Sequence, residues 1–587
     1  MTTRCLEIIF IPAVANQHLP WSHLTSYSAL RNPLLFVEIA IIAGMLATAF
    51  IPPVSGIISV WSEIPALLYL RALFWIPGLL VLPGLSLVRL IPPLSAQPRI
   101  AKIVLAPIIS FALFGTLAVV LNVVGALGSL PWVALALVAA LEGFARYKTR
   151  DSPPFDLRAL DPRGMHKGYF ILLAAALASI AMAIGFQITW QYGYPQDTWV
   201  SFLSGIKLIT GRSAVEAFST SFYPISFGYI IAGLSLCTGF PLVNAQALLI
   251  PFTALEVLSL FTLARVVFGR GIYTSSLAAL IFGFCGGFGW MVLLSRANWQ
   301  NLFMYISNLT KDMYFGPFFF YSYFFYYKSL ALMMAFASVI IFSISGRTEV
   351  LRCKISTAVL SSFLIVWAFL IHMLPAVLAP MVVVMALIFN ERRQQLKSLL
   401  VYIISAAALL LAMDLMMEGV YVDLIFVKGV PLISAVLGGR TLLVAAGLAG
   451  ALAVALVLFF LMRRGSLKMP EKNPLGSRLK LVVALALLAV YLAGGLFFSY
   501  STYSVSSSAV FPWYLYVTRY GFIGILAILG IYTSRWKAEW FKVCVVWAII
   551  AIAMGSLWWG ERLNSYLFPG GAILAGGALG NLFNRAS

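Results

Sequence analysis

The fold class follows from the stretch Gly168-Tyr-Phe-Ile-Leu-Leu-Ala-Ala-Ala-Leu-Ala-Ser-Ile-Ala-Met-Ala-Ile-Gly-Phe-Gln-Ile188, which contains no Asp, Glu, Lys or Arg. A helix needs about 20 predominantly apolar residues to cross the hydrocarbon core of a bilayer. The stretch therefore predicts a transmembrane helix. A short motif with a single acid, Tyr194-Pro-Gln-Asp-Thr-Trp199, follows its end.

The composition extends this interpretation to the whole chain of 587 residues, which is 62% hydrophobic and only 10% charged. About a quarter of the residues of a typical soluble chain are charged. The sequence therefore predicts an all-α polytopic membrane protein. The net charge of +20 does not indicate nucleic-acid binding, because the basic residues form short clusters between apolar runs. The five cysteines show neither a metal-binding spacing nor a disulfide framework.

Apolar runs recur along the sequence, and sixteen of them predict membrane spans. These runs are 34–52, 66–90, 100–125, 131–146, 168–188, 241–267, 271–292, 328–346, 356–373, 374–390, 397–416, 439–462, 479–499, 513–533, 540–558 and 566–583. Polar, proline-containing sequence separates the fourth run from the fifth. We therefore predict a four-span N-terminal module (1–147), a cytoplasmic linker (148–167) and a main membrane domain (168–587). The second run contains Pro77-Gly78 and Pro83-Gly84, which predict a kink or a partly re-entrant path.

The run 222–239 is a special case, because it is apolar but is not counted among the spans. If it lies on the outer surface, 29 of the 39 lysines and arginines fall on the cytoplasmic side, as the positive-inside rule requires. If it spans, most of the basic clusters that follow it face outward. We therefore predict an interfacial or re-entrant segment at 222–239, a plasma-membrane location and cytoplasmic termini.

This topology collects the polar motifs of the chain on the extracytoplasmic face. Asp197 lies early in the first large outer loop, before Phe222-Tyr-Pro224. His372 lies in the tight hairpin Ile371-His-Met-Leu-Pro375. The last outer loop contains Trp558-Trp-Gly-Glu-Arg562 and continues to Tyr566.

The layout and these motifs resemble the GT-C superfamily of membrane glycosyltransferases, over roughly 168–583. Members place an acidic motif early in a large first external loop, followed by helices that lie on the membrane surface. The resemblance implies a GT-C-like helix bundle with interfacial helices in that loop. It also implies a sugar donor carried on polyprenyl phosphate or diphosphate, a glycan, lipid or protein acceptor, and a role in glycosylation at the cell envelope. One departure is that Gln196 precedes a lone Asp197, where many members carry two acids.

The chemistry of such a transfer assigns roles to particular residues. A carboxylate must accept the proton of the attacking hydroxyl, and Asp197 is the predicted general base of an inverting reaction. Cations must stabilise the departing lipid phosphate. Arg562 and Arg519 are the leading candidates for that role, and the further predicted substrate contacts are His372, Lys428, Arg440, Tyr566 and Trp199. Asp197 and Asp312 form a possible Mg²⁺ or Mn²⁺ site, since both ions prefer oxygen ligands.

Each assignment has a structural alternative. The alternative for Asp197 is a solvated or helix-capping residue, and the alternative for Arg562 is an interfacial arginine that pairs with Glu561 or with lipid headgroups. His372 is equally compatible with an interfacial histidine. At the level of the whole protein, a lipid-linked-sugar flippase or transporter is the main alternative, and a non-catalytic membrane scaffold is another. A transporter predicts paired charges in mid-membrane and an internal repeat, and the sequence shows no obvious repeat.

Overall fold

The computed structural model describes most of the helical core of the protein. The residues described are 33–54, 56–149, 166–189, 196–218, 226–284, 327–372, 393–422, 481–489, 515–534, parts of 540–547 and 568–586. Within these residues all regular secondary structure is helical. The all-α prediction is confirmed for this part of the chain.

Eight helical segments of the described chain are long and apolar enough to cross a bilayer. They are Ala66–Leu90, Arg99–Val123, Leu127–Thr149, Lys167–Gly185, Ile250–Val267, Tyr327–Gly346, Leu351–Ile371 and Lys397–Met416. Every one of them overlaps a predicted span. The protein is therefore a polytopic membrane protein, while the total of sixteen spans remains a prediction because many of the predicted runs extend beyond the described residues.

The second predicted span is interrupted, as its Pro-Gly pairs indicated. It consists of α2 (Ala66–Leu80) and α3 (Leu82–Leu90), separated by Val81, whose φ of −129° departs from helical geometry. Proline has no N–H and its ring clashes with the preceding turn, so Pro77 weakens the end of α2. Pro83 lies in the first turn of α3, where proline is tolerated and suits the start of a new helix. The backbone N–H of Gly84 donates instead to the Ser110 hydroxyl of α5 at 2.8 Å. The break is therefore fixed by a neighbouring helix.

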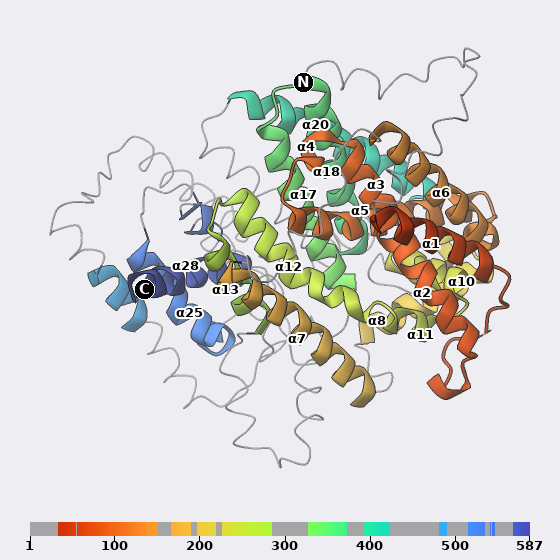
Figure 1. Ribbon diagram of the computed structural model, residues 1–587, viewed down its shortest axis with the longest axis horizontal. Coiled ribbons are helices and arrows are strands. Elements are labelled where there is room, and N and C mark those ends of the chain that lie inside the picture. Colours follow the sequence, from red (N-terminus) through yellow and green to blue (C-terminus); the bar gives the residue numbers. More distant parts are fainter. Residues whose placement is uncertain are drawn as a thin grey trace, which may run out of the picture.

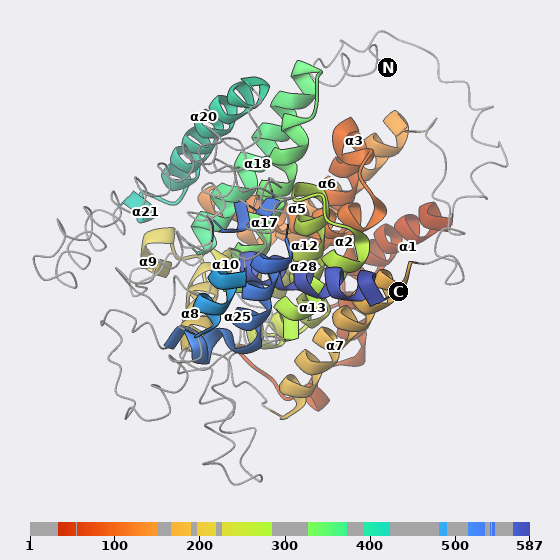
Figure 2. The ribbon, with the colours of Figure 1, turned by 90° about the vertical axis from the view of Figure 1, so that its left-hand side faces the viewer.

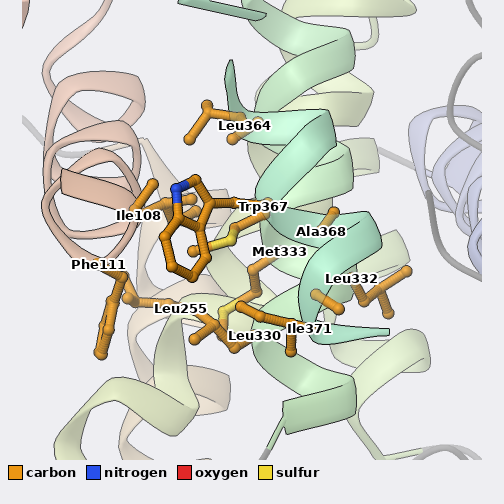
Figure 3. Packing of buried hydrophobic residues seen from close by; sticks show 14 of the residues in the cluster. Ile108, Phe111, Leu255, Leu330, Leu332, Met333, Leu364, Trp367, Ala368 and Ile371 are labelled. Carbon is orange, nitrogen blue, oxygen red and sulfur yellow. The ribbon is translucent and has the colours of Figure 1, made fainter. Parts of the chain in front are cut away.

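The helices pack around one large apolar core, which Figure 3 shows at its centre. Trp367 of α18 (Leu351–Ile371) is fully buried, and its indole Nε1 donates to the Thr116 hydroxyl of α5 (Arg99–Val123) at 2.9 Å. Ile108 and Phe111 of α5 lie on one side of this indole, and Met333 of α17 (Tyr327–Gly346) lies on another. Helices of the N-terminal module and of the main domain therefore share a single core.

Polar contacts between helix ends define the two ends of this bundle. At one end, the Ser345 hydroxyl near the end of α17 donates to the carbonyl of Lys354 at 3.0 Å and to the Ser398 hydroxyl of α20 (Arg393–Met416) at 3.3 Å. Arg347 donates there to the carbonyl of Val266 at 2.8 Å. At the other end, the Tyr421 hydroxyl donates to the carbonyl of Leu370 at 2.6 Å, which joins the far ends of α18 and α20.

Four short helices cover the second of these ends, which we call the capped end. They form the cap: α8 (Gln196–Ile209), α9 (Ala214–Phe218), α10 (Phe227–Thr238) and α11 (Leu242–Ala247). The N-terminal end of α10 contacts the end of α18, and its C-terminal end contacts the loop between α1 (Pro33–Thr48) and α2. Twelve helical residues span about 18 Å, too little to cross the hydrocarbon core. The described part of the run 222–239, residues 227–238, is therefore a helix shorter than a span at one end of the bundle, and its placement at the membrane surface remains a prediction.

The opposite end carries a network of buried charges, which we call the charge network. Arg89 at the end of α3 and Arg146 of α6 (Leu130–Thr149) each pair with both Glu38 of α1 and Glu142 of α6. The Arg89–Glu142 and Arg146–Glu142 contacts are 2.7 and 2.9 Å, and both glutamates are buried. Two positive and two negative groups therefore tie α1, α3 and α6 together.

The C-terminal helices form a separate flank. The helices α25 (Leu515–Thr533) and α28 (Phe568–Ala586) pack on one another, and α28 packs on α13 (Ile272–Phe284), which also contacts α7 (Lys167–Thr189). Figure 1 shows α25 and α28, in blue, away from α8 and α10, with α7 and α13 between them. Figure 2 shows α20 and α21 along the outer edge beyond α18.

Candidate functional site

Side chains from five helical elements come together at the capped end. We call this group the capped-end cluster and define it by Ser226, Tyr327, His372, Asp414 and Tyr421. They belong, in that order, to the start of the α10 segment, the start of α17, the end of α18, the end of α20 and α21 (Val420–Val422). All five residues are buried. A concentration of buried polar groups at the end of an apolar bundle is the strongest feature of this part of the molecule.

Tyr421 is the centre of the hydrogen bonding in the cluster. Its hydroxyl donates to the carbonyl of Leu370 at 2.6 Å and lies in hydrogen-bonding contact with the hydroxyl of Ser226. Its backbone N–H donates to Asp414 Oδ1 at 2.8 Å. Burial raises the pKa of the Tyr421 phenol well above its usual value. The phenol therefore stays protonated and acts as a permanent donor to the last turn of α18.

His372 directly follows α18, where the backbone turns from helical to extended geometry. Its ring stacks on Tyr327, with ring centroids 5.6 Å apart and an angle of 26° between the planes. The side chain is only 5% exposed, and the Nζ of Lys328 lies 5.4 Å from the centroid of the same tyrosine ring. Packing on Tyr327 thus fixes the orientation of the imidazole.

The turn between α20 and α21 has an unusual backbone. Glu418 has a φ of +59°, and Gly419 follows with a φ of +75°. A side chain in this left-handed region costs roughly 1–2 kcal/mol and is uncommon outside Asn, Asp and Gly. The Glu418 carboxylate accepts the backbone N–H of Val215 in α9 at 3.4 Å. The turn therefore directs an exposed acid toward the cap, and such outliers tend to gather at functional sites.

The predicted base, Asp197, is the second residue of α8, and its side chain lies outside the described part of the structure. The first turn of a helix favours a negative charge, because the helix dipole is positive there. Trp199 is described: its ring lies 5.3 Å from that of the buried Phe202, nearly edge-on at 77°. Both rings belong to α8, and Trp199 also packs against the apolar core, while any contact with a substrate remains a prediction.

Contacts along α10 connect the helix of Asp197 to the capped-end cluster. The helices α8 and α10 cross closely at Gly228, where a Cβ would lie only 3.3 Å from that of Ser204. Ser226, two residues earlier, donates its backbone N–H to the carbonyl of Leu370 at 3.4 Å. His372 lies two residues beyond Leu370. The structure therefore brings α8 and His372 to one end of the bundle, although 175 positions separate Asp197 from His372.

The other predicted site residues lie outside the described part of the structure or away from α8. Arg562, Tyr566, Lys428, Arg440 and Asp312 lie outside the described residues, so their roles remain predictions. The backbone of Arg519 lies in the second turn of α25, on the flank that Figure 1 shows away from α8 and α10. The structure thus does not bring the helix of Arg519 next to that of Asp197.

No metal-binding set is evident in the described part of the chain. Within it, no three His, Cys, Asp or Glu side chains come together as a metal would require. The ligands predicted for Mg²⁺ or Mn²⁺, Asp197 and Asp312, both have side chains outside that part.

Sequence reasoning missed Tyr421 and Ser226. Neither residue belongs to a motif, and a tyrosine between two valines carries no signal of its own. The available hint was Asp414, an acid close to the end of an apolar run, since such acids usually have a partner or a function. The structure supplies that partner, the backbone N–H of Tyr421.

Comparison with known proteins provides no further assignment. No family model, no curated protein and no solved structure matches the chain.

Proposed function

We propose that the protein is a membrane glycosyltransferase of GT-C type, which transfers a sugar from a polyprenyl-phosphate or polyprenyl-diphosphate donor to an acceptor hydroxyl at the extracytoplasmic face. One observation carries the proposal. The helix that begins with the acidic motif, α8, packs on α10, and α10 contacts the end of α18 beside the buried His372. Polar residues that are distant in sequence are thus gathered at one end of an apolar bundle, where a lipid-anchored substrate presents its headgroup.

In the proposed reaction, the acceptor oxygen attacks the anomeric carbon while Asp197 takes the proton of the hydroxyl. The bond between this carbon and the phosphate oxygen breaks, and the electron pair leaves with the lipid phosphate. A single displacement of this kind inverts the anomeric configuration. Arg562 is the proposed cation that stabilises the departing phosphate, because an arginine side chain presents a planar fork that matches phosphate oxygens. The place of α25 on the flank leaves Arg519 out of this proposal.

The capped-end cluster has a supporting role in this proposal. Stacking on Tyr327 fixes the imidazole of His372, which could then contact the phosphate without first losing side-chain freedom. Tyr421 holds the last turn of α18, from which His372 projects. The stacking of His372 and the hydrogen bonds of Tyr421 both depend on the relative positions of α10, α17, α18 and α21.

A transporter is less well supported by the described charges. Transport models place paired charges near the bilayer midplane. The buried pairs of this protein involve Arg89 in the last turn of α3 and Arg146 in the last turn of α6. They lie close to helix ends, at the end of the bundle opposite to the cap, where they join helices of one module.

The test is sugar transfer in reconstituted vesicles that contain a radiolabelled polyprenyl-phosphate hexose. We expect Asp197→Asn to lower the rate by about 10²- to 10⁴-fold, the usual contribution of a general base. Glu216→Gln is the matched control, since Glu216 is an exposed acid of the same cap that pairs with Arg212 at 3.6 Å. The control should retain its rate. Full activity of the Asp197→Asn protein would remove Asp197 from the mechanism.

A further inference from the structure

The C-terminal end of α10 is held by an arginine from the N-terminal module. Arg71 of α2 is only 3% exposed, and its guanidinium donates to the carbonyls of Cys237 at 2.7 Å, Leu236 at 3.3 Å and Ile51. The first two carbonyls belong to the last turn of α10, which has no N–H donors of its own for them. The positive charge also complements the negative end of the helix dipole. A residue of the N-terminal module thus satisfies the terminus of a cap helix.

Three further contacts fix the chain directly after α10. Gly239, with a φ of +77° that suits glycine, accepts the N–H of Val54 at 2.9 Å. The side-chain amide of Asn244 pairs with both the N–H and the carbonyl of Ser59, each at 3.0 Å. The N–H of Val243 donates to the carbonyl of Ile57 at 3.0 Å. We call these contacts, together with those of Arg71, the clip.

The opposite end of the same helix enters the capped-end cluster. Ser226 contacts Leu370 and Tyr421 there, as described above. Between the two ends α10 is almost entirely buried, and the Tyr229 hydroxyl accepts the side-chain amide of Asn122 at 3.3 Å. A buried helix cannot easily bend or rotate in a densely packed interior. A shift at the clip is therefore passed along about 18 Å of helix to Ser226.

We propose that the N-terminal module is a positioning element of the site: the clip holds α10, and α10 holds the capped-end cluster in its working geometry. Arg71 is then a positioning residue for the reaction, although it lies one helix length away from Ser226. The role in catalysis rests on the proposed function, whereas the mechanical coupling along α10 does not.

Thiol reporters at the two ends of α10 test the coupling without any substrate. Cys237 is fully buried, and burial raises the pKa of its thiol, so alkylation should be slow. One background keeps Cys237 alone by replacing Cys5, Cys285, Cys353 and Cys544 with alanine. A second background also replaces Cys237 and carries Ser226→Cys, at a position that is fully buried as well.

Arg71→Met should raise the rate of N-ethylmaleimide modification at least about tenfold at both reporter positions, because loss of the clip exposes the buried thiols. Removal of the positive charge alone would act in the opposite direction at Cys237, since Arg71 lowers the pKa of that thiol. The matched control is Arg89→Met. It also removes a largely buried arginine of the same module, but from the charge network at the opposite end. In that control both thiols should stay protected. Protection of both thiols in Arg71→Met, or equal exposure in the two variants, would overturn the proposal.

Activity measured per folded molecule then tests the positioning role. With a radiolabelled polyprenyl-phosphate hexose, Arg71→Met should lower kcat by about tenfold with little change in KM, because misplaced groups slow the chemical step. Arg71→Lys should restore part of the rate, and Arg89→Met should reduce only the folded fraction. An unchanged kcat of Arg71→Met beside exposed thiols would keep the coupling and reject its role in the reaction.

Two further outcomes remain decisive: failure of Arg71→Met to fold, and absence of hexose transfer by the wild-type protein. If Arg71→Met does not fold, Asn244→Ala removes a second part of the clip, and the same thiol and rate measurements decide. If the wild-type protein transfers no hexose, the proposed function fails. The thiol rates then still confirm or overturn the coupling along α10.

Discussion

The two ends of the helical bundle are closed by different chemistry. At the opposite end, four charged side chains of the charge network pair with one another and join helices of one module. At the capped end, the contacts run mostly from side chains to backbone carbonyls, as from Tyr421 to Leu370 and from Arg71 to Cys237. The first arrangement joins long helices, whereas the second holds short helices and a strained turn. Stability and candidate function are thus separated along the axis of the bundle.

The largest stability effect should come from the charge network. Glu142→Leu leaves Arg89 and Arg146 with Glu38 as their remaining acidic partner, and breaking a buried pair in this way costs about 3–5 kcal/mol. The measurement is the free energy of unfolding in mixed micelles. Transfer activity per folded molecule should be unchanged. A loss of activity without a loss of stability would contradict the separation of the two ends.

A smaller effect on stability, but one with consequences for the site, is expected from Tyr421→Phe. The change leaves the hydroxyl of Ser226 and the carbonyl of Leu370 without the phenol, at a cost of about 1–3 kcal/mol. Because the end of α18 carries His372, the transfer rate per folded molecule should also fall. Full activity in this variant would mean that the cluster has only a structural role.

Two variants of His372, which stacks on Tyr327, distinguish its packing role from a polar role in the reaction. His372→Ala should lower the free energy of unfolding by about 0.5–1.5 kcal/mol through loss of the aromatic pair, in addition to the buried area. His372→Phe keeps an aromatic ring there and should lose less stability. If both variants lose transfer activity equally, the polar ring has a role in the reaction. If His372→Phe is fully active, the residue is a packing element.

The smallest effect, and one of opposite sign, is expected at the strained turn. Glu418→Gly removes the side chain from the left-handed region and should raise the free energy of unfolding by up to about 1 kcal/mol. Activity should fall if the strain serves to present the carboxylate to the cap. Glu418→Asn, which tolerates the same backbone, is the control for loss of charge alone. A destabilised Glu418→Gly protein would show that the turn depends on its acid.

The fold could be predicted well from sequence wherever one physical rule dominated. The apolar length of the run 168–188 predicted α7, and the Pro-Gly pairs predicted the break between α2 and α3. The placement of 222–239 came from the charges that follow it, and it stays a prediction beside the short helix α10 that the run contains. These rules depend on the apolar length, the proline positions and the flanking charges of a segment, and they need no knowledge of its neighbours.

The site could be predicted only in part, for a physical reason. Motifs indicated α8 and His372, but the residues that join them, Ser226 and Tyr421, act through hydrogen bonds to a backbone carbonyl. Such contacts leave no pattern in a sequence, because any residue can supply the carbonyl. The charge network was missed for a related reason. Its acids, Glu38 and Glu142, lie inside apolar runs, and only the fold brings Arg89 to them.

The contact between Arg71 and Cys237 also has a consequence for the order in which the protein is made. The two residues are 166 positions apart, so α2 is synthesised long before α10 leaves the ribosome. An apolar helix of twelve residues is too short to be inserted as a span of its own. Its final place therefore depends on a docking surface that the earlier helices have already built. The surface of α2 that holds the end of α10 is thus made before α10 itself.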